Sequence, residues 1–403
     1  MPAADDRLER YANLAVHVGL NLQPGQTLAV NGLLEHAPLV RAIAAAGYEA
    51  GARYVDVYYA DQHVRRAHIE LADDDMLDHS PSWLVQRYRE LGETGGALCA
   101  ITGNPEPEIY ADLDGARVGK ARMRRVSEES LKLTDGLCNW TIVAFPNEGW
   151  ARTVFGEPDV ERLWQAVATA VRLDEPDPVA AWREHIARLE HRAAALNERR
   201  FDRIRYRGPG TDLEVGLHPD GIWLAALDES RGIEHVANMP TEEVYTAPDS
   251  RRVEGTVRST LPLQIQGTIV RDLEIHFEGG RAVDLRASSG EDVMRTHVAS
   301  DEGAKRLGEL ALVDRDSRVG RTGVVFYDTL FDENASSHIA LGSAIFKAVP
   351  WAGDLSPEER SARGVNTSSL HTDFMIGSDE LEIDGVTADG EAVPILREGT
   401  WQL

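Results

Sequence analysis

Three short segments in the C-terminal half carry the side chain types that bind divalent metal ions. These segments are NMPTEEVYTAP with Glu242 and Glu243, LFDENASSHIALG with Asp332, Glu333 and His338, and SSLHTDFMIGS with His371 and Asp373. A fourth segment, RLGELALV, places Glu309 among apolar residues after an expected helix. Divalent ions require deprotonated carboxylates and neutral imidazoles that converge from rigid elements. The residue types therefore indicate a metal site, provided that the fold brings the four segments together.

The spacing within each segment limits which of its side chains can face the same metal ion. Side chains at i and i+2 of an extended segment share a face, so His371 and Asp373 could chelate one ion. The adjacent Glu242 and Glu243 point to opposite faces of a strand, which leaves only one of them facing inward. Glu333 and its neighbouring histidine share a face only if the segment between them turns.

Each of these patterns also has a purely structural explanation. Taken alone, Glu242 and Glu243 fit solvated turn residues. An acidic residue in a segment such as LGELALV more often extends to water or forms an ion pair than binds a metal. A His-x-Asp pattern also occurs by chance. The metal hypothesis therefore depends on the four segments taken together.

The first half of the chain alternates helical and strand patterns. Strands are expected at Leu28–Val30, Tyr54–Tyr59, Leu98–Thr102 and Trp140–Phe145, with a helical run over Ala37–Glu49. Such alternation predicts βαβ units and a mostly parallel sheet. No GxGxxG and no GxxxxGK[ST] motif follows these strands, so the usual phosphate cradle of a nucleotide site is not predicted.

After the Pro- and Asp-rich segment LDEPDPVAAW, the alternation of helical and strand patterns gives way to a helix and then to strand patterns joined by turns. An amphipathic helix follows, with apolar residues from Val179 to Leu196 at helical spacing. The segments RIRYRGPGTDLEVGL, GIWLAAL and LPLQIQGTIVRDLEIHFEGGRAVDLRAS then show strand patterns joined by turns, which favours antiparallel pairing. One helix, Asp292–Leu307, interrupts them.

We predict an α/β N-terminal domain with a mostly parallel sheet over residues 1–195. An α+β metal-binding domain with largely antiparallel strands follows over residues 196–403.

The composition of the chain indicates which binding partners and which cellular location to expect. The 403 residues include 42 basic and 67 acidic side chains, and the net charge of −25 repels nucleic acid and anionic membranes. No signal peptide pattern and no run of about 18 apolar residues is visible, so we expect a cytoplasmic protein without a membrane partner. Cys99 and Cys138 lie in apolar runs and are expected to be buried thiols, not a disulfide or zinc motif.

The metal-binding segments also match a known pattern in sequence and order. The motifs PTEEV, LGELALV, DENASSHIALG and HTDFMIG follow one another along the chain. Together with RYANLAVHVGLNLQPGQ, NWTIVAFPNEGWA and YRGPGTDLEVGL, they make the sequence resemble the M29 metallo-aminopeptidases of the aminopeptidase T and AmpS type. The resemblance covers nearly the whole chain, and four independent motifs in the same order make it specific.

The resemblance implies two divalent ions per chain, zinc, cobalt or manganese, held in the C-terminal domain. The implied ligands are Glu243 and Glu309, one of which bridges the ions, together with Glu333, His338, His371 and Asp373. Which ligand serves which ion is left open. The resemblance also implies peptides with a free N-terminus as substrates and a homodimer in which the N-terminal domain helps to enclose the catalytic space.

The implied reaction is attack of a metal-activated water on the first peptide carbonyl. Two cations about 3.5–4 Å apart lower the pKa of water toward about 7, so that hydroxide is present at neutral pH. A carboxylate must then carry the proton to the leaving amine. The candidate catalytic residues are Glu242, Glu309 and Glu333. Glu242 could shuttle the proton or anchor the α-amino group, and Glu333 could shuttle it if it is not a ligand.

Two alternative functions remain open at this stage. Ile345 stands where the M29 pattern usually has a tyrosine, so the protein could be a weakly active peptide-binding homologue. Some hydroxypyridine ring-cleaving dioxygenases resemble this framework and hold a single iron, for which His338, His371 and Asp373 would serve. The two glutamates Glu243 and Glu309 favour a pair of ions, because a single iron leaves them without a role.

Overall fold

The computed structural model describes residues 4–265 and 268–403 of the chain. The chain divides into two compact units, one of Met1–Glu184 with Leu227–Pro240 and one of His185–Ala226 with Thr241–Leu403. We refer to them as unit 1 and unit 2. The predicted domain boundary between residues 195 and 196 stays a prediction.

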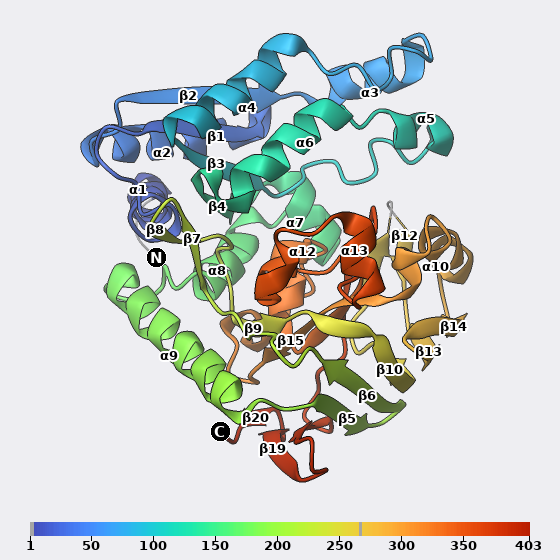
Figure 1. Cartoon of the computed structure of the whole chain (residues 1–403). Coiled ribbons are helices and arrows are strands. Elements are labelled where there is room, and N and C mark those ends of the chain that lie inside the picture. Colours follow the sequence, from blue (N-terminus) through green and yellow to red (C-terminus); the bar gives the residue numbers. More distant parts are fainter. Residues whose placement is uncertain (1–3, 266–267) are drawn as a thin grey trace. The chain divides into compact units, whose positions relative to one another are not determined.

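Unit 1 contains a four-stranded parallel sheet with the strand order β2-β1-β3-β4 (Figure 1). Its strands are β1 (Thr27–Leu33), β2 (Tyr54–Ala60), β3 (Ala97–Thr102) and β4 (Asn139–Ala144). Successive β1 residues face opposite sides of the sheet. Ala29 packs in a cluster with Leu84 and Leu91 of α4 (Ser82–Thr94), whereas Leu28 lies against Gly47 of α2 (Ala37–Glu49). Helices therefore cover both faces, and the predicted parallel α/β arrangement is confirmed.

The remaining elements of unit 1 are mostly helical. They are α1 (Ala4–Leu14), η1 (Ala15–Gly19), η2 (Leu34–His36), α3 (Gln62–Leu71), α5 (Gly115–Lys120), α6 (Arg124–Lys132), η3 (Leu133–Leu137), α7 (Glu148–Phe155), α8 (Val160–Ala170) and the hairpin of β7 (Leu227–Ser230) and β8 (Ile233–Val236). Both cysteines are buried free thiols, and burial raises the pKa of each to about 12. Within the described ranges, no helix combines the length and apolar character needed to cross a membrane.

Unit 2 is built from antiparallel sheets, which confirms the prediction for the C-terminal half. An eight-stranded sheet has the order β14-β13-β10-β6-β5-β18-β19-β20. Its strands are β5 (Arg203–Gly208), β6 (Thr211–Leu217), β10 (Pro248–Arg258), β13 (Glu274–Glu278), β14 (Arg281–Arg286), β18 (Glu382–Val386), β19 (Ala392–Arg397) and β20 (Thr400–Trp401). A two-stranded sheet pairs β11 (Leu263–Ile265) with β12 (Thr268–Val270).

A separate four-stranded sheet carries most of the predicted metal ligands. Its order is β17-β16-β15-β9, and all pairs are antiparallel. The strands are β9 (Glu243–Thr246), β15 (Leu307–Val313), β16 (His338–Gly342) and β17 (His371–Met375). One face of this sheet belongs to the apolar core of unit 2, through Val244, Leu310, Leu312, Ile339 and Phe374. Side chains alternate along each strand, so the intervening residues must project from the opposite face.

Helices and turns complete unit 2. They are α9 (Pro178–Arg199), whose first turns belong to unit 1, α10 (Glu291–Val298), η4 (Gly303–Lys305), α11 (Arg318–Arg321), α12 (Thr329–Asp332), η5 (Glu333–Ala335), η6 (Phe346–Ala348), η7 (Pro350–Ala352) and α13 (Pro357–Ala362). The apolar stripe of α9 behaves as predicted, because Leu189, Ala193 and Leu196 are buried in the core.

Two predicted elements of the C-terminal half are wrong. The helix expected over Asp292–Leu307 ends at Val298, because the Asp301 side chain accepts a hydrogen bond from the Ala304 amide and Leu307 already pairs with Leu341 in a sheet. The expected strand GIWLAAL is broken: Leu224 forms an isolated bridge and only the last residue, Leu227, enters a strand, since the backbone amides of Ile222 and Leu224 bond to two different neighbours. Residues 266 and 267 of the predicted strand LPLQIQGTIV lie outside the described residues.

The alternation along β15 generates a prediction about stability. Leu310 is fully buried on the core face, so Leu310→Ala should cost about 2–5 kcal/mol of unfolding free energy through lost burial and a residual cavity. The measurement is chemical denaturation followed by fluorescence. As a control in unit 2, Val283→Ala removes a half-exposed side chain and should stay within about 0.5 kcal/mol of the parent. Equal losses for the two variants would contradict the assigned faces of β15.

Candidate metal centre

Five of the six predicted ligands project from the face of the four-stranded sheet that is turned away from the core. The cross-strand register shows why. Glu309 of β15 lies opposite Ala340 of β16, which lies opposite Asp373 of β17. Ala311 lies opposite His338 in the next row of the same face. The alanines and Gly342 leave space above the sheet, so the acidic and imidazole side chains can converge there.

The remaining two side chains enter this face from the ends of the sheet. Glu243, the first residue of β9, lies opposite Val313, and His371, the first residue of β17, lies opposite Gly342. Because the sheet pairs β9 with β15 and β17 with β16, residues more than a hundred positions apart in sequence lie on one surface.

The ligand atoms form two groups that share one carboxylate. Glu243, Glu309 and His338 have ligand atoms within 4.8 Å of one another, and so do Glu309, His371 and Asp373. His338 Nε2 lies 3.0 Å from Glu243 Oε2. His371 Nε2 lies 2.9 Å from Glu309 Oε2 and 3.3 Å from Asp373 Oδ1. Glu309 is therefore common to both groups.

Both imidazoles are oriented for coordination through Nε2. His371 Nδ1 lies 2.8 Å from the Ser343 carbonyl oxygen, and His338 Nδ1 lies 3.3 Å from the Ser336 carbonyl oxygen. A carbonyl oxygen can only accept, so each Nδ1 carries the proton that it donates. In the neutral ring, Nε2 is then the free lone pair, which is the arrangement that metal-binding histidines usually show.

The electrostatics of the cluster also fit cations. Burial disfavours charged imidazoles, but contact with the carboxylates outweighs it, raising the pKa of His338 to about 10 and that of His371 well above its ordinary value. Burial raises the pKa of Glu309, opposed by His371. Glu243 Oε2 and Asp373 Oδ1 each face an imidazole Nε2 and have no other hydrogen-bond partner among the described residues. Buried carboxylate oxygens of this kind need a positive partner, which is either a protonated imidazole or a cation.

Glu333 is placed differently from the other predicted ligands. It begins η5, is partly buried, and belongs to neither group of ligand atoms. Loss of water contact, together with the charges of Asp373 and Glu243, raises its pKa well above the ordinary value. Glu333 therefore lies close enough to the cluster for the negative charges there to raise its pKa.

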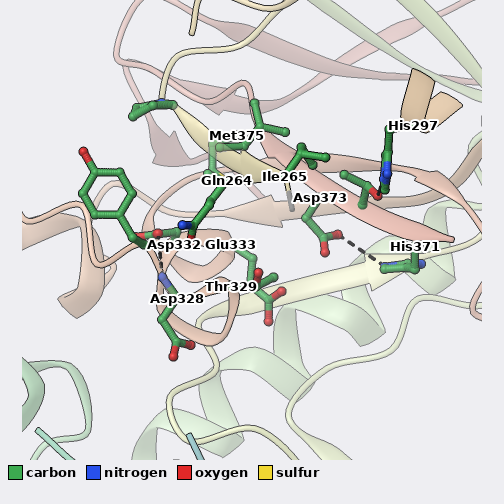
Figure 2. A pocket seen from close by; sticks show the side chains of 14 residues that line it. Gln264, Ile265, His297, Asp328, Thr329, Asp332, Glu333, His371, Asp373 and Met375 are labelled. Carbon is green, nitrogen blue, oxygen red and sulfur yellow. Dashed lines mark hydrogen bonds and ion pairs between the residues drawn. The ribbon is translucent and has the colours of Figure 1, made fainter. Parts of the chain in front are cut away.

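A pocket of about 260 Å³ in unit 2 opens beside the cluster (Figure 2). Its lining includes Glu333, His371 and Asp373, and Figure 2 shows the Asp373 side chain pointing toward His371. The lining is completed by Pro262, Leu263, Gln264, Ile265, His297, Tyr327, Asp328, Thr329, Asp332, Thr372 and Met375. The pocket thus has an apolar part and an acidic part, and a substrate bound in it would touch the candidate ligands.

The structure separates Glu242 from the metal groups. Glu242 and Glu243 are only 3% and 6% exposed, so the expectation of solvated turn residues is wrong. They point in different directions, as alternation requires, but Glu242 lies 3.6 Å from His185 Nε2 of α9 instead of in water. The Glu242 amide donates to Asn334 Oδ1 at 2.7 Å. Glu242 belongs to neither ligand group, so the geometry gives it no direct contact with a cation there.

Sequence reasoning missed the groups that orient the ligands. The carbonyls of Ser336 and Ser343 carry no sequence signal, because every residue has a backbone carbonyl. The small residues Ala311 and Ala340 could have been read from the alternation of LGELALV and HIALG once the pairing was known. Ile345, where a tyrosine was expected, begins the turn of η6 and is not part of the described pocket lining.

Comparison with known proteins links this geometry to one family. A family model described as thermophilic metalloprotease (M29) matches residues 4–401. The chain is 43% identical to aminopeptidase T of Thermus aquaticus and 38% identical to aminopeptidase AmpS of Bacillus subtilis, with all of each chain covered. A solved structure of wild-type AmpT from Thermus thermophilus superposes with a TM-score of 0.92 at 40% identity, covering both chains completely.

A second solved structure shares the fold at much lower similarity. The 2,5-dihydroxypyridine dioxygenase of Pseudomonas putida KT2440 superposes with a TM-score of 0.54 at 11% identity, over 100% of this chain and 98% of that one. At that identity the likeness concerns the fold alone.

The raised pKa values of the two histidines predict that cation binding depends on pH. Without a cation, the raised pKa values favour the protonated form of both imidazoles, and the stabilisation that protonated His338 provides is lost as the pH rises through its pKa of about 10. A cation must displace these protons, so its affinity should rise by up to about tenfold per pH unit for each proton released. Titration calorimetry with Zn²⁺ in two buffers of different ionisation enthalpy counts the protons. Binding without proton release would contradict the assigned ligands.

Proposed function

The chain belongs to the M29 family of thermophilic metalloproteases, and on this basis we propose that it is an aminopeptidase that removes N-terminal amino acids from peptides with the help of two divalent cations. The main support for the proposal is that the two groups of possible ligand atoms share Glu309. One group would hold a cation with Glu243 and His338, and the other with His371 and Asp373. Zinc, cobalt and manganese all accept such mixed carboxylate and imidazole ligands.

Charge balance supports a pair of ions. Glu243, Glu309, Glu333 and Asp373 place four carboxylates in or beside the two groups. Like charges at such short range cannot all remain ionised in a buried site without compensation. Two divalent cations would neutralise four carboxylates while the imidazoles remain neutral, which is the protonation state that coordination requires.

The proposed chemistry is hydrolysis of the first peptide bond. Bound divalent cations supply Lewis acidity, which makes water nucleophilic at neutral pH and polarises a peptide carbonyl. The pocket beside the cluster would hold the N-terminal residue, and Asp328 in its lining supplies a carboxylate that suits a free ammonium group. A blocked N-terminus carries no such charge, so the geometry favours exopeptidase action.

Glu333 is the best placed residue to transfer the proton. It lines the pocket, lies beside the ligand groups and belongs to neither of them. A carboxylate in this position can accept a proton from water and deliver it to the leaving amine, as hydrolysis of an amide requires. Glu242 is less suitable, since its carboxylate lies beside His185 of α9. The homodimer and the cytoplasmic location expected from the sequence stay part of this proposal.

The arrangement of the histidines argues against a single iron. A ring-cleaving dioxygenase site of the kind considered from the sequence would need His338, His371 and Asp373 around one ion. Among the described residues, the ligand atoms instead place His338 with Glu243 and Glu309, and His371 in a different group. The low identity to the dioxygenase supports a common fold only.

The variant His371→Ala tests the metal assignment. It should abolish hydrolysis of aminoacyl-p-nitroanilides and reduce bound metal, because Glu309 and Asp373 would lose the third member of their group. Metal content by mass spectrometry and a colorimetric assay measure the two effects. The control His276→Ala removes a half-exposed imidazole of β13 and should leave both unchanged. Retained activity in His371→Ala would refute the assignment.

The variant Glu333→Gln separates proton transfer from metal binding. If Glu333 is the proton shuttle, kcat should fall by about 100- to 10,000-fold while the protein keeps both cations. The amide has nearly the same shape and cannot take up the proton. Steady-state kinetics on unblocked peptides and metal content are measured on the same sample. Loss of a cation would show instead that Glu333 is a ligand, as the resemblance to the family implies.

A further inference from the structure

The candidate ligand His371 lies at one edge of the four-stranded sheet. It is the first residue of β17, one of the two edge strands of the order β17-β16-β15-β9. Its side chain is 35% exposed, whereas that of His338, in the inner strand β16, is 1% exposed. A strand end with one neighbour frays more easily than an inner strand. Some other part of unit 2 must therefore hold the backbone that leads into His371.

The carboxylate of Asp301, a half-buried residue, contacts that backbone. Asp301 Oδ2 accepts hydrogen bonds from the Ser369 amide at 2.9 Å, the Ser369 hydroxyl at 2.8 Å and the Ser368 hydroxyl at 3.0 Å. Asp301 Oδ1 accepts from the Ser368 hydroxyl at 2.9 Å and from the Ala304 amide at 2.8 Å. The carboxylate thus joins the turn after α10 to the two residues that precede Leu370 and His371.

Further contacts join the turn after α10 to the segment that precedes β17. Asn366, 5% exposed, donates to the carbonyls of Gly303 at 2.8 Å and Gly342 at 2.5 Å. A Cβ on Gly303 would collide with the Thr367 carbonyl oxygen, so the two segments are in direct contact. The junction therefore links the start of β17 to the end of β16, whose next residue supplies the carbonyl that orients His371.

Asp301 is suited to act as a permanent acceptor. Burial opposes its charge, but the hydrogen bonds from Ser369, Ser368 and Ala304 lower its pKa to about 2. It therefore stays ionised throughout the neutral range and accepts hydrogen bonds from four donors, with the Ser368 hydroxyl shared between its two oxygens. Charge-assisted hydrogen bonds of this kind are stronger than neutral ones. Asp301 is not among the ligand groups, so it acts on them only through the chain.

We propose that Asp301 is a positioning residue that sets the cation affinity of the group Glu309, His371 and Asp373, and leaves that of the group Glu243, Glu309 and His338 largely unaffected. The inference rests on the proposed two-cation function. It follows from the position of the strands: Asp301 supports the start of the edge strand β17, whereas His338 and Glu243 are held by other strands of the sheet. Residues that orient ligands from outside typically change metal affinity by about 10- to 100-fold.

The test is a Co²⁺ titration of metal-free Asp301→Asn, followed by calorimetry and by visible absorption. Asparagine keeps the shape but replaces one acceptor oxygen by a donor, so it must face donors of Ser368, Ser369 or Ala304. We expect two binding events, one of them weakened by about 10- to 100-fold and the other within about threefold of the parent. Asp292→Asn makes the same charge change at an exposed position of α10 and should bind both cations like the parent.

The outcomes separate this inference from the proposed function. A parent protein that binds no Co²⁺ overturns both. Two unchanged affinities in Asp301→Asn, or an equal loss at both sites, overturn the positioning role alone, because a general structural effect would not distinguish the sites. If Asp301→Asn does not fold, the double variant Ser368→Ala/Ser369→Ala decides, since it removes the hydroxyl donors and keeps the Ser369 amide bond. It should weaken the same single site, and unchanged affinities would refute the inference.

Discussion

The repulsion among carboxylates on one small face of a sheet is the constraint on which the rest of the structure depends. Glu243, Glu309 and Asp373 lie on that face, and Glu333 lies beside it. In a buried site, such a concentration of negative charge is stable only with protons on the imidazoles and carboxyls or with cations between them. The raised pKa values of His338 and His371 show the first kind of compensation, and the shared carboxylate Glu309 is arranged for the second.

A sheet is well suited to hold such a charged cluster. Its strict alternation lets the same strands contribute apolar residues to the core on one face and ligands on the other, so the core of unit 2 fixes the ligand positions. Small residues such as Ala340 keep the ligand face open. The weak point is the edge, where β17 has only one neighbouring strand. The turn after α10 lies beside the start of this strand, where the Asp301 carboxylate accepts hydrogen bonds from Ser368 and Ser369.

Much of the fold followed from periodic patterns, and the errors occurred where distant contacts overruled them. The four parallel strands of unit 1 and the helix Ala37–Glu49 matched their patterns, because burial on both sides or on one stripe leaves a clear trace in composition. The helix predicted to reach Leu307 stops at Val298, since Asp301 bonds to a segment nearly seventy residues away and Leu307 joins a sheet. Local helical preference could not reveal either partner.

The amino-acid sequence predicted the kinds of groups at the centre and their order along the chain, and its four specific motifs indicated the M29 family. These are local properties that each segment carries wherever it lies. Three distinctions come from the folded chain alone: Glu309 is common to both groups, Glu242 lies beside His185, and Glu333 belongs to neither group. Those distinctions depend on strand register and on which neighbour covers each face. A shift of one residue in register would send every ligand to the opposite side.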